Sequence, residues 1–323
     1  MIERDVIIVG GGPAGSSAAW QLGREDVRCL VLDREEFPRE KLCAGWVTPE
    51  VLNDLEIDPG EYPHRLLTFE ALRISVKGLP VSLRSPQHSI RRFEFDHYLL
   101  ERSGAERQVH KVRDIRIEND GYVIDDTFRC RYLIGAGGTR CPVHRTLFRE
   151  AHPHSKALQA VTLELEFPCN WQDADCHLWF LEKRLPGYAW YVPKADGYLN
   201  LGVGAMAEKL ARRGGDIRSH WQRLIDKVIG KGLIDEDPGP PSGYSYFLRG
   251  PASGGRLGNA FVVGDAAGLA TRDMCEGIGP AVRSGIRAAD TILGRGEFSL
   301  DSVDPYTSQN RLVSGFLDYS LAG

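Results

Sequence analysis

The feature that most constrains the fold is a glycine-rich turn close to the start of the sequence. The apolar run at residues 6–9 leads directly into the turn at 10–15 (Gly-Gly-Gly-Pro-Ala-Gly), and a segment with helical character continues to Gly23. A second apolar run, at 27–32, ends in Asp33. The order of strand, glycine turn, helix and strand predicts a βαβ unit, and therefore a parallel sheet with helices packed on it.

The spacing of the glycines fits the dinucleotide-binding fingerprint G-x-G-x-x-G. Gly10 permits the tight turn, Gly12 lets the backbone approach a pyrophosphate, and Gly15 allows the helix to pack closely on the strand. The N-terminus of the helix then faces the diphosphate. Asp33 ends the next strand, where its carboxylate can accept hydrogen bonds from ribose hydroxyls. We therefore predict a dinucleotide site, although this motif alone does not separate FAD from NAD.

A second motif lies near the other end of the sequence. The segment 264–268 (Gly-Asp-Ala-Ala-Gly) follows an apolar run, and Gly277-Ile278-Gly279 opens a helix. The Asp265 carboxylate is placed to bind a ribityl hydroxyl. The N–H groups near Gly277 and Gly279 can meet the pyrimidine edge of a flavin, where a helix dipole stabilises negative charge on the reduced ring. Together the two motifs select FAD.

The rest of the chain alternates between strand and helix patterns. Alternating residues on both sides of Lys77-Gly78 predict a hairpin, and three short runs between 109 and 135 predict a meander. Residues 157–205 predict an antiparallel sheet with a turn at 193–197. Helices are predicted at about 95–103, at 216–233 and from Pro280 onward.

These patterns predict an α/β protein with two interleaved domains. The Rossmann-type FAD-binding domain is expected to comprise 1–65, 91–150 and 250–323. An inserted domain built on an antiparallel sheet is expected to comprise 66–90 and 151–249, and it would hold the substrate.

Composition excludes several classes of protein and site. The formal net charge of -4 gives no broad basic surface, so nucleic acid is not an expected partner. The first apolar run is too short for a signal peptide, and no apolar stretch is long enough to span a bilayer. We expect a cytoplasmic protein with at most peripheral contact at the inner membrane face. Seven scattered cysteines without CxxC pairs fit a reducing compartment and predict no metal site.

The motifs together resemble those of the FAD-dependent oxidoreductases with the p-hydroxybenzoate hydroxylase fold, and most of all their geranylgeranyl reductase branch. The matching segments, in order along the chain, are 10–15 with Asp33, 37–45, 92–96, 188–194 and 264–279. The resemblance implies FAD contacts at Gly10, Gly12, Ala14, Gly15, Asp33, Cys43, Ala44, Arg92, Val112, Gly264, Asp265, Gly277, Ile278 and Gly279.

The candidate catalytic residues are Tyr188, Trp190 and Cys43. Tyr188, Trp190 and Val192 share one face of a strand because side chains alternate, and in the family this strand faces the flavin. An ordinary aromatic core stripe is the alternative interpretation. Cys43 is a candidate proton donor or thiolate, and the alternative is a small packing residue, as for Cys275.

One departure from the pattern bears on the reaction. Aromatic hydroxylases of this fold keep an acid in the segment that here reads Gly135-Ala136-Gly137-Gly138. The missing acid disfavours aromatic hydroxylation. The resemblance to the geranylgeranyl reductases then implies an FAD-dependent reductase that acts on C=C bonds of an apolar, isoprenoid-like substrate, with NAD(P)H or another reduced carrier as reductant. The alternatives are a monooxygenase or halogenase in which reduced FAD activates oxygen, and a flavoprotein accessory factor that acts on a protein partner.

Overall fold

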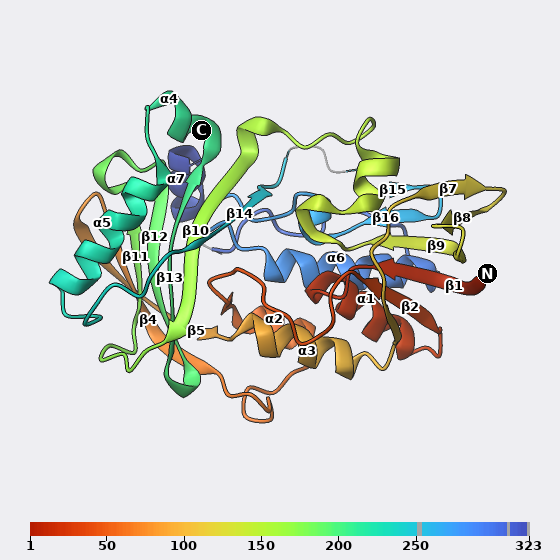
Figure 1. Ribbon diagram of the computed structural model, residues 1–323, viewed down its shortest axis with the longest axis horizontal. Coiled ribbons are helices and arrows are strands. Elements are labelled where there is room, and N and C mark those ends of the chain that lie inside the picture. The colour runs from red at the N-terminus through yellow and green to blue at the C-terminus, as the bar shows by residue number, and fades with distance from the viewer. Residues whose placement is uncertain (251–253, 309–310, 322–323) are drawn as a thin grey trace. The chain divides into compact units, whose positions relative to one another are not determined.

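The computed structural model describes residues 1–250, 254–308 and 311–321 (Figure 1). The chain divides into two compact units, each assembled from segments that are far apart in sequence. Unit 1 comprises Met1–Arg39, Phe93–Ser155 and Phe247–Gln309, and unit 2 comprises Glu40–Arg92, Lys156–Tyr246 and Asn310–Gly323.

Unit 1 is built on a mainly parallel sheet. Its strands run in the order β15-β16-β9-β1-β2-β6, with β15 antiparallel at the edge and the other neighbours parallel. The bounds of these strands are β1 (Ile2–Val9), β2 (Cys29–Asp33), β6 (Glu106–Val109), β9 (Phe128–Gly135), β15 (Arg256–Leu257) and β16 (Ala260–Val262). The predicted βαβ unit is confirmed, because β1 and β2 pair in parallel on either side of the helix α1 (Pro13–Gly23).

The two faces of this sheet are covered differently. Val6 and Ile8 of β1 pack in a cluster that also contains residues of α1, of α3 (Arg92–Arg102) and of α6 (Ile278–Ile292). Ile7 and Val9 belong to a cluster on the other face, which the meander of β7 (Ile115–Glu118), β8 (Gly121–Ile124) and β9 covers. The predicted meander is thus confirmed, and the sheet is apolar on both faces, as is usual for parallel sheets.

Helices from the two ends of the chain pack against each other in unit 1. A β-carbon at Gly285 of α6 would lie 2.2 Å from the Ala14 carbonyl oxygen, and one at Gly264 would lie 3.2 Å from the Ala14 β-carbon. Figure 1 shows α1 and α6 side by side. Small residues at this contact therefore bring the two glycine motifs into one unit.

Unit 2 is built on a mixed sheet in the order β14-β10-β13-β12-β11-β4-β5-β3. The predicted hairpin is formed by β4 and β5, with Lys77 and Gly78 at positive φ in the turn, and the predicted antiparallel sheet by β10 to β13. The strand bounds are β3 (Trp46–Val47), β4 (Leu67–Val76), β5 (Leu79–Ser89), β10 (Gln159–Pro168), β11 (Cys176–Phe180), β12 (Gly187–Lys194), β13 (Tyr198–Met206) and β14 (Ser242–Phe247).

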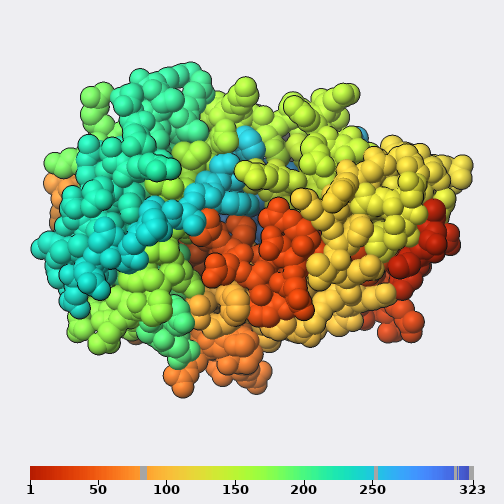
Figure 2. Space-filling view, in the orientation of Figure 1, coloured from red at the N-terminus to blue at the C-terminus, as the bar shows by residue number. Residues whose placement is uncertain are grey.

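One helix covers one face of this second sheet. The helix α5 (Ile217–Gly230) packs Trp221, Leu224 and Ile225 into a cluster with Tyr191 and with other apolar residues of β12 and β13. Its atoms, teal at the left of Figure 2, form an outer surface of unit 2. The Asp216 carboxylate caps the helix by accepting the N–H groups of residues 218 and 219.

Several elements differ from the sequence-based expectations. Residues 40–65, expected in the FAD-binding domain, belong to unit 2, where β3 pairs with β5 and is followed by α2 (Pro49–Asp54). The helix α6 begins at Ile278, so Pro280 lies within its first turn. The helices α4 (Ala207–Arg212) and α7 (Arg311–Leu321) were not anticipated. None of the helices in the described part of the chain has the length and apolar character needed to cross a membrane.

Candidate functional site

The glycine turn of unit 1 is fixed by close backbone contacts. Gly10 has a φ of 110°, and a β-carbon there would lie 2.4 Å from the Ala136 carbonyl oxygen. A β-carbon at Gly15 would lie 1.9 Å from the Gly10 carbonyl oxygen. Both positions therefore require glycine for space, and Gly10 also requires it for backbone conformation.

The N-terminus of α1 is open to an anionic group. Gly12 is the N-cap, no side chain caps the helix, Pro13 occupies the first turn, and the first turn carries no acidic residue. The Asp33 carboxylate accepts the Gly11 N–H at 2.7 Å through Oδ2 and the Glu35 N–H at 3.0 Å through Oδ1. Asp33 thus holds the turn in place, and the helix end has the free N–H groups and dipole that bind a diphosphate.

Arg39 lies beside this turn, and the sequence analysis missed it. A β-carbon at Gly12 would lie 3.4 Å from Arg39 Nη2. The guanidinium lies over the Phe37 ring and forms an ion pair of 3.5 Å with the fully buried Asp96. The position is within the matched segment 37–45, but only the fold shows that this arginine reaches the turn. Arg92, which the resemblance assigns to FAD, belongs to unit 2.

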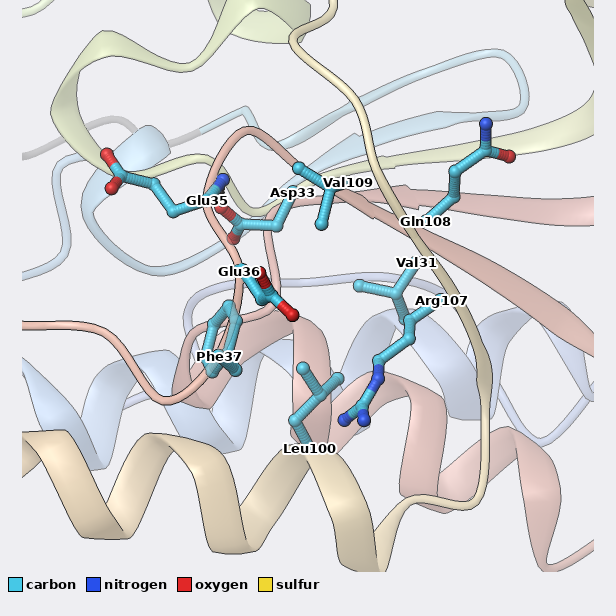
Figure 3. Close-up of a pocket in the computed structure, with 9 residues that line it drawn as sticks. All are labelled: Val31, Asp33, Glu35, Glu36, Phe37, Leu100, Arg107, Gln108 and Val109. Atoms are coloured by element: carbon cyan, nitrogen blue, oxygen red, sulfur yellow. Dashed lines mark hydrogen bonds between the residues drawn. The ribbon is translucent and has the colours of Figure 1, made fainter.

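A pocket opens beyond the end of β2 (Figure 3). Figure 3 shows Asp33 and Val109 at one end of it and Phe37 and Leu100 at the other. The rest of the lining is charged or polar apart from Val31, and comprises Glu35, Glu36, Arg107 and Gln108. The apolar side chains and the Asp33 carboxylate fit a base and ribose that extend from a diphosphate at the helix end. Val112, also assigned to FAD by the resemblance, lies farther along the chain in the core beneath the meander and is 8% exposed.

The second motif lies in the same unit, at the start of α6. Gly264 has a φ of 58° and donates its N–H to Ser284 Oγ at 2.9 Å. A β-carbon at Gly277 would lie 3.3 Å from Asp265 Oδ1, so the carboxylate and the helix start are neighbours. This arrangement places the Asp265 carboxylate beside the first turn of α6, as expected for a group that binds the ribityl chain.

The first turn of α6 already has an acceptor within the protein. Glu276 Oε1 accepts the Gly279 N–H at 2.7 Å, and the Ile278 N–H also bonds to this side chain. Burial raises the pKa of Glu276 to about 7, although these two bonds oppose the shift. A flavin that contacts Ile278 and Gly279 would therefore share their N–H groups with the Glu276 carboxyl. The sequence analysis did not single out Glu276.

In unit 2, a buried lysine organises the segment that contains Cys43 and Ala44. Lys194 Nζ donates to the carbonyl oxygens of Ala44 at 2.6 Å and Ile90 at 2.8 Å, and its side chain has no exposed surface. Gly45 has a φ of 65°, and a β-carbon there would lie 2.6 Å from Lys194 Nζ. Cys43 is partly exposed, and its Sγ accepts the Gly45 N–H at 3.4 Å.

In unit 2, one amide side chain links two of the candidate catalytic residues, and the third contacts one of them through its ring. Asn200 Oδ1 accepts the Trp190 indole N–H at 2.7 Å, and its Nδ2 donates to the Cys43 carbonyl oxygen at 3.3 Å. The Tyr188 ring lies 5.7 Å from the Trp190 ring and stacks on Phe180 at 4.7 Å. The sequence analysis missed Asn200, because nothing in the local pattern distinguishes it from other polar strand residues.

Comparisons with known proteins agree with this geometry. A family model for an NAD(P)-binding Rossmann-like domain matches residues 8–60. The menaquinone reductase of Mycolicibacterium smegmatis is 30% identical, over 97% of this chain and 82% of that protein. Digeranylgeranylglycerophospholipid reductase 2 of Methanosphaera stadtmanae is 24% identical, over 95% and 83%. The chain belongs to the geranylgeranyl reductase family.

Structural comparison shows the same fold. The crystal structure of a geranylgeranyl bacteriochlorophyll reductase-like protein from Thermoplasma acidophilum matches with a TM-score of 0.78 at 20% identity, over 99% of this chain and 83% of that one. The predicted fold, with a Rossmann-type domain of the p-hydroxybenzoate hydroxylase kind, is confirmed. Like its family, the protein is an FAD-dependent oxidoreductase. The open α1 terminus, Arg39 and Asp33 together fit the adenosine diphosphate part of FAD.

A histidine stack supports the second motif of this family member. The rings of His144 and His154 stack at 4.0 Å, and His154 also packs on Phe247 at 4.4 Å. His154 Nε2 lies 3.1 Å from the Ala266 carbonyl oxygen, so Nε2 carries the proton. Burial, followed by the neighbouring His144, lowers the pKa of His154 to about 4. His154 lies in no helix or strand, and its contacts give it a supporting role beside the second motif.

This stack predicts a loss of stability in mild acid. The pKa of His154 is about 4 in the folded protein and 6.5 when unperturbed, so the unfolded chain binds more protons as the pH falls between these values. Between pH 7 and 4.5 the free energy of unfolding of unit 1 should fall by roughly 1–2 kcal/mol from this residue, after allowance for solvent screening. Urea unfolding at each pH, monitored by FAD fluorescence, measures this free energy.

The variant His154→Gln tests the assignment, because a glutamine amide can still donate to Ala266. This variant should lose less of its free energy of unfolding between pH 7 and pH 4.5 than the wild type. The control variant His64→Gln in unit 2 should lose as much as the wild type. An identical pH dependence in wild type and His154→Gln would contradict the role of the stack.

Proposed function

We propose that this enzyme uses reduced FAD to hydrogenate carbon–carbon double bonds in the isoprenoid part of an apolar substrate. The observation that carries the proposal is the pair of aromatic side chains, Tyr188 and Trp190, on the face of the unit 2 sheet opposite α5. The named relatives support it, since their names describe reductases of menaquinone and of digeranylgeranylglycerophospholipid. Both kinds of molecule carry long unsaturated chains.

The proposed roles of the residues follow from their positions. The free N–H groups at the start of α1 bind the diphosphate of FAD, and Arg39 neutralises part of its charge. Asp33 accepts ribose hydroxyls and Asp265 accepts a ribityl hydroxyl. Tyr188 and Trp190 pack against the substrate chain and exclude water. When bound and reduced, FAD supplies a hydride, and NAD(P)H or another reduced carrier then reduces the flavin again.

The test is an anaerobic single turnover. Protein reconstituted with FAD and reduced with dithionite is mixed with a geranylgeranyl lipid, a menaquinone with an unsaturated side chain, or a saturated phytanyl lipid as control. We expect oxidation of the flavin and a mass gain of two hydrogens for the unsaturated lipids only. Absence of a gain in every lipid, with oxygen or halogen incorporated into an aromatic substrate in air, would instead support the monooxygenase or halogenase alternative.

A further inference from the structure

The two faces of the unit 2 sheet differ, since one packs under α5 and the other carries aromatic and polar side chains. Leu163, Tyr191 and Leu201, on three neighbouring strands, belong to the core under α5. On the opposite face the register places Gly202 between Glu164 of β10 and Trp190 of β12. Glu164 and Trp190 therefore lie on the same face, separated by a residue without a side chain.

Trp190 fills the space above that glycine. A β-carbon at Gly202 would lie 2.1 Å from Trp190 Cζ2, and one at Gly204 would lie 3.4 Å from Cζ3. The indole thus lies across β13 and extends toward the strand that carries Glu164. The aromatic surface proposed to hold the substrate has an acid at its edge.

Glu164 is buried but incompletely bonded. It is 3% exposed, and its Oε2 has no hydrogen-bond partner among the residues that the structure describes. Asn200, which also binds the Trp190 indole, bonds to the same side chain. An unsatisfied buried carboxyl oxygen is destabilising, so a purely structural acid would be expected to have both oxygens bonded.

The charged groups around Glu164 come from several elements. Lys41 precedes β3, Lys194 ends β12 and Arg92 begins α3, and each lowers the pKa of the carboxyl. Burial opposes them and prevails, raising this pKa to about 7. Lys194 Nζ already donates to two carbonyl oxygens. Near neutral pH, Glu164 is therefore an acid that can release a proton and recover it.

We propose that Glu164 is the catalytic proton donor in the alkene reduction, a role that rests on the proposed function. One alkene carbon receives the hydride that reduced FAD supplies. The π electron pair forms the second C–H bond with the proton of the Glu164 carboxyl at the other carbon. The substrate gains two hydrogens, FAD is left oxidised, and Glu164 becomes a carboxylate that takes a new proton from solvent.

The kinetic test compares Glu164→Gln with Glu166→Gln. Glu166 lies two residues further along β10 and pairs with Arg91 at 2.8 Å, so its change removes a carboxylate of the same strand that has an ion-pair partner. Glu164→Gln should slow flavin oxidation by the alkene about 100-fold or more, and Glu166→Gln should not. The wild-type rate should fall as the pH rises through 7, and the residual rate of Glu164→Gln should not depend on pH. A wild-type rate and pH profile in Glu164→Gln would overturn the role.

A second measurement needs no turnover. Infrared difference spectra of the FAD-bound protein between pH 6 and pH 8 should contain C=O bands of two protonated carboxyls, because Glu276 titrates in the same range as Glu164. One of these bands should be absent from Glu164→Gln and present in Glu166→Gln. Absence of such a band in the wild type overturns the proton donor even if alkenes are reduced. A band at Glu164 in a protein that reduces no alkene overturns the proposed function, and with it this role, while confirming the buried acid.

Discussion

Replacing Gly15 with valine is expected to abolish retention of FAD and to destabilise unit 1 by more than about 3 kcal/mol. The new β-carbon would lie 1.9 Å from the Gly10 carbonyl oxygen and 3.1 Å from Ile8 Cγ2. The first of these atoms is backbone in a turn that Asp33 and the Ala136 segment fix from other sides, so it cannot move without displacing α1 from β1. The measurement is FAD content after purification, with hydrogen–deuterium exchange of α1 and β1.

The matched control is Gly230→Val at the end of α5. A β-carbon at Gly230 would meet nothing within 4 Å, so only the small difference in helix propensity between glycine and valine acts, and stability should change by less than about 1 kcal/mol. Full FAD content in Gly15→Val would show that the turn is not held as the structure describes.

Replacing Trp190 with alanine is expected to destabilise unit 2 by about 3–5 kcal/mol. The side chain is 5% exposed, packs over Gly202 and Gly204, and donates its N–H to Asn200. Gly202 and Gly204, the residues beneath the indole, have no side chains that could fill the space. Hydrogen–deuterium exchange should therefore accelerate in β10, β12 and β13, while exchange in unit 1 stays as in the wild type.

Trp190→Phe separates ring packing from the hydrogen bond. It should cost about 1–3 kcal/mol, because the Asn200 oxygen loses its donor while an aromatic ring remains. Because Trp190 is proposed to pack against the substrate chain, Trp190→Phe should retain far more alkene reduction activity than Trp190→Ala. Unchanged exchange in the β10 to β13 peptides of Trp190→Ala would contradict the packing.

The predictions that came from local patterns agree with the structure. The glycine turn, the hairpin at Lys77-Gly78 and the helix at α5 depend on a few consecutive residues whose allowed conformations and apolar spacing are visible in the sequence. The FAD cofactor could also be predicted, because each glycine motif is recognisable by itself and only their combination selects the flavin.

The residues that the sequence analysis missed depend on contacts between distant segments. Arg39 is a candidate because the fold brings it beside the turn that contains Gly12. Glu164 is a candidate because the strand register sets it beside Gly202. Glu164 had one signal in the sequence, an acid between two leucines in a predicted strand. The sequence gives no measure of how deeply that acid is buried or which of its oxygens lacks a partner.

By itself, the sequence determined that this chain forms a Rossmann-type unit with a glycine turn for FAD, because strand, turn and helix follow from short-range sterics and apolar periodicity. Only the tertiary structure decided which polar side chains surround that turn and which acid lies beside Trp190. Pairing of strands from separate segments sets Glu164 beside Trp190, buries it and leaves one of its oxygens without a hydrogen-bond partner among the described residues, and these features make it a candidate proton donor.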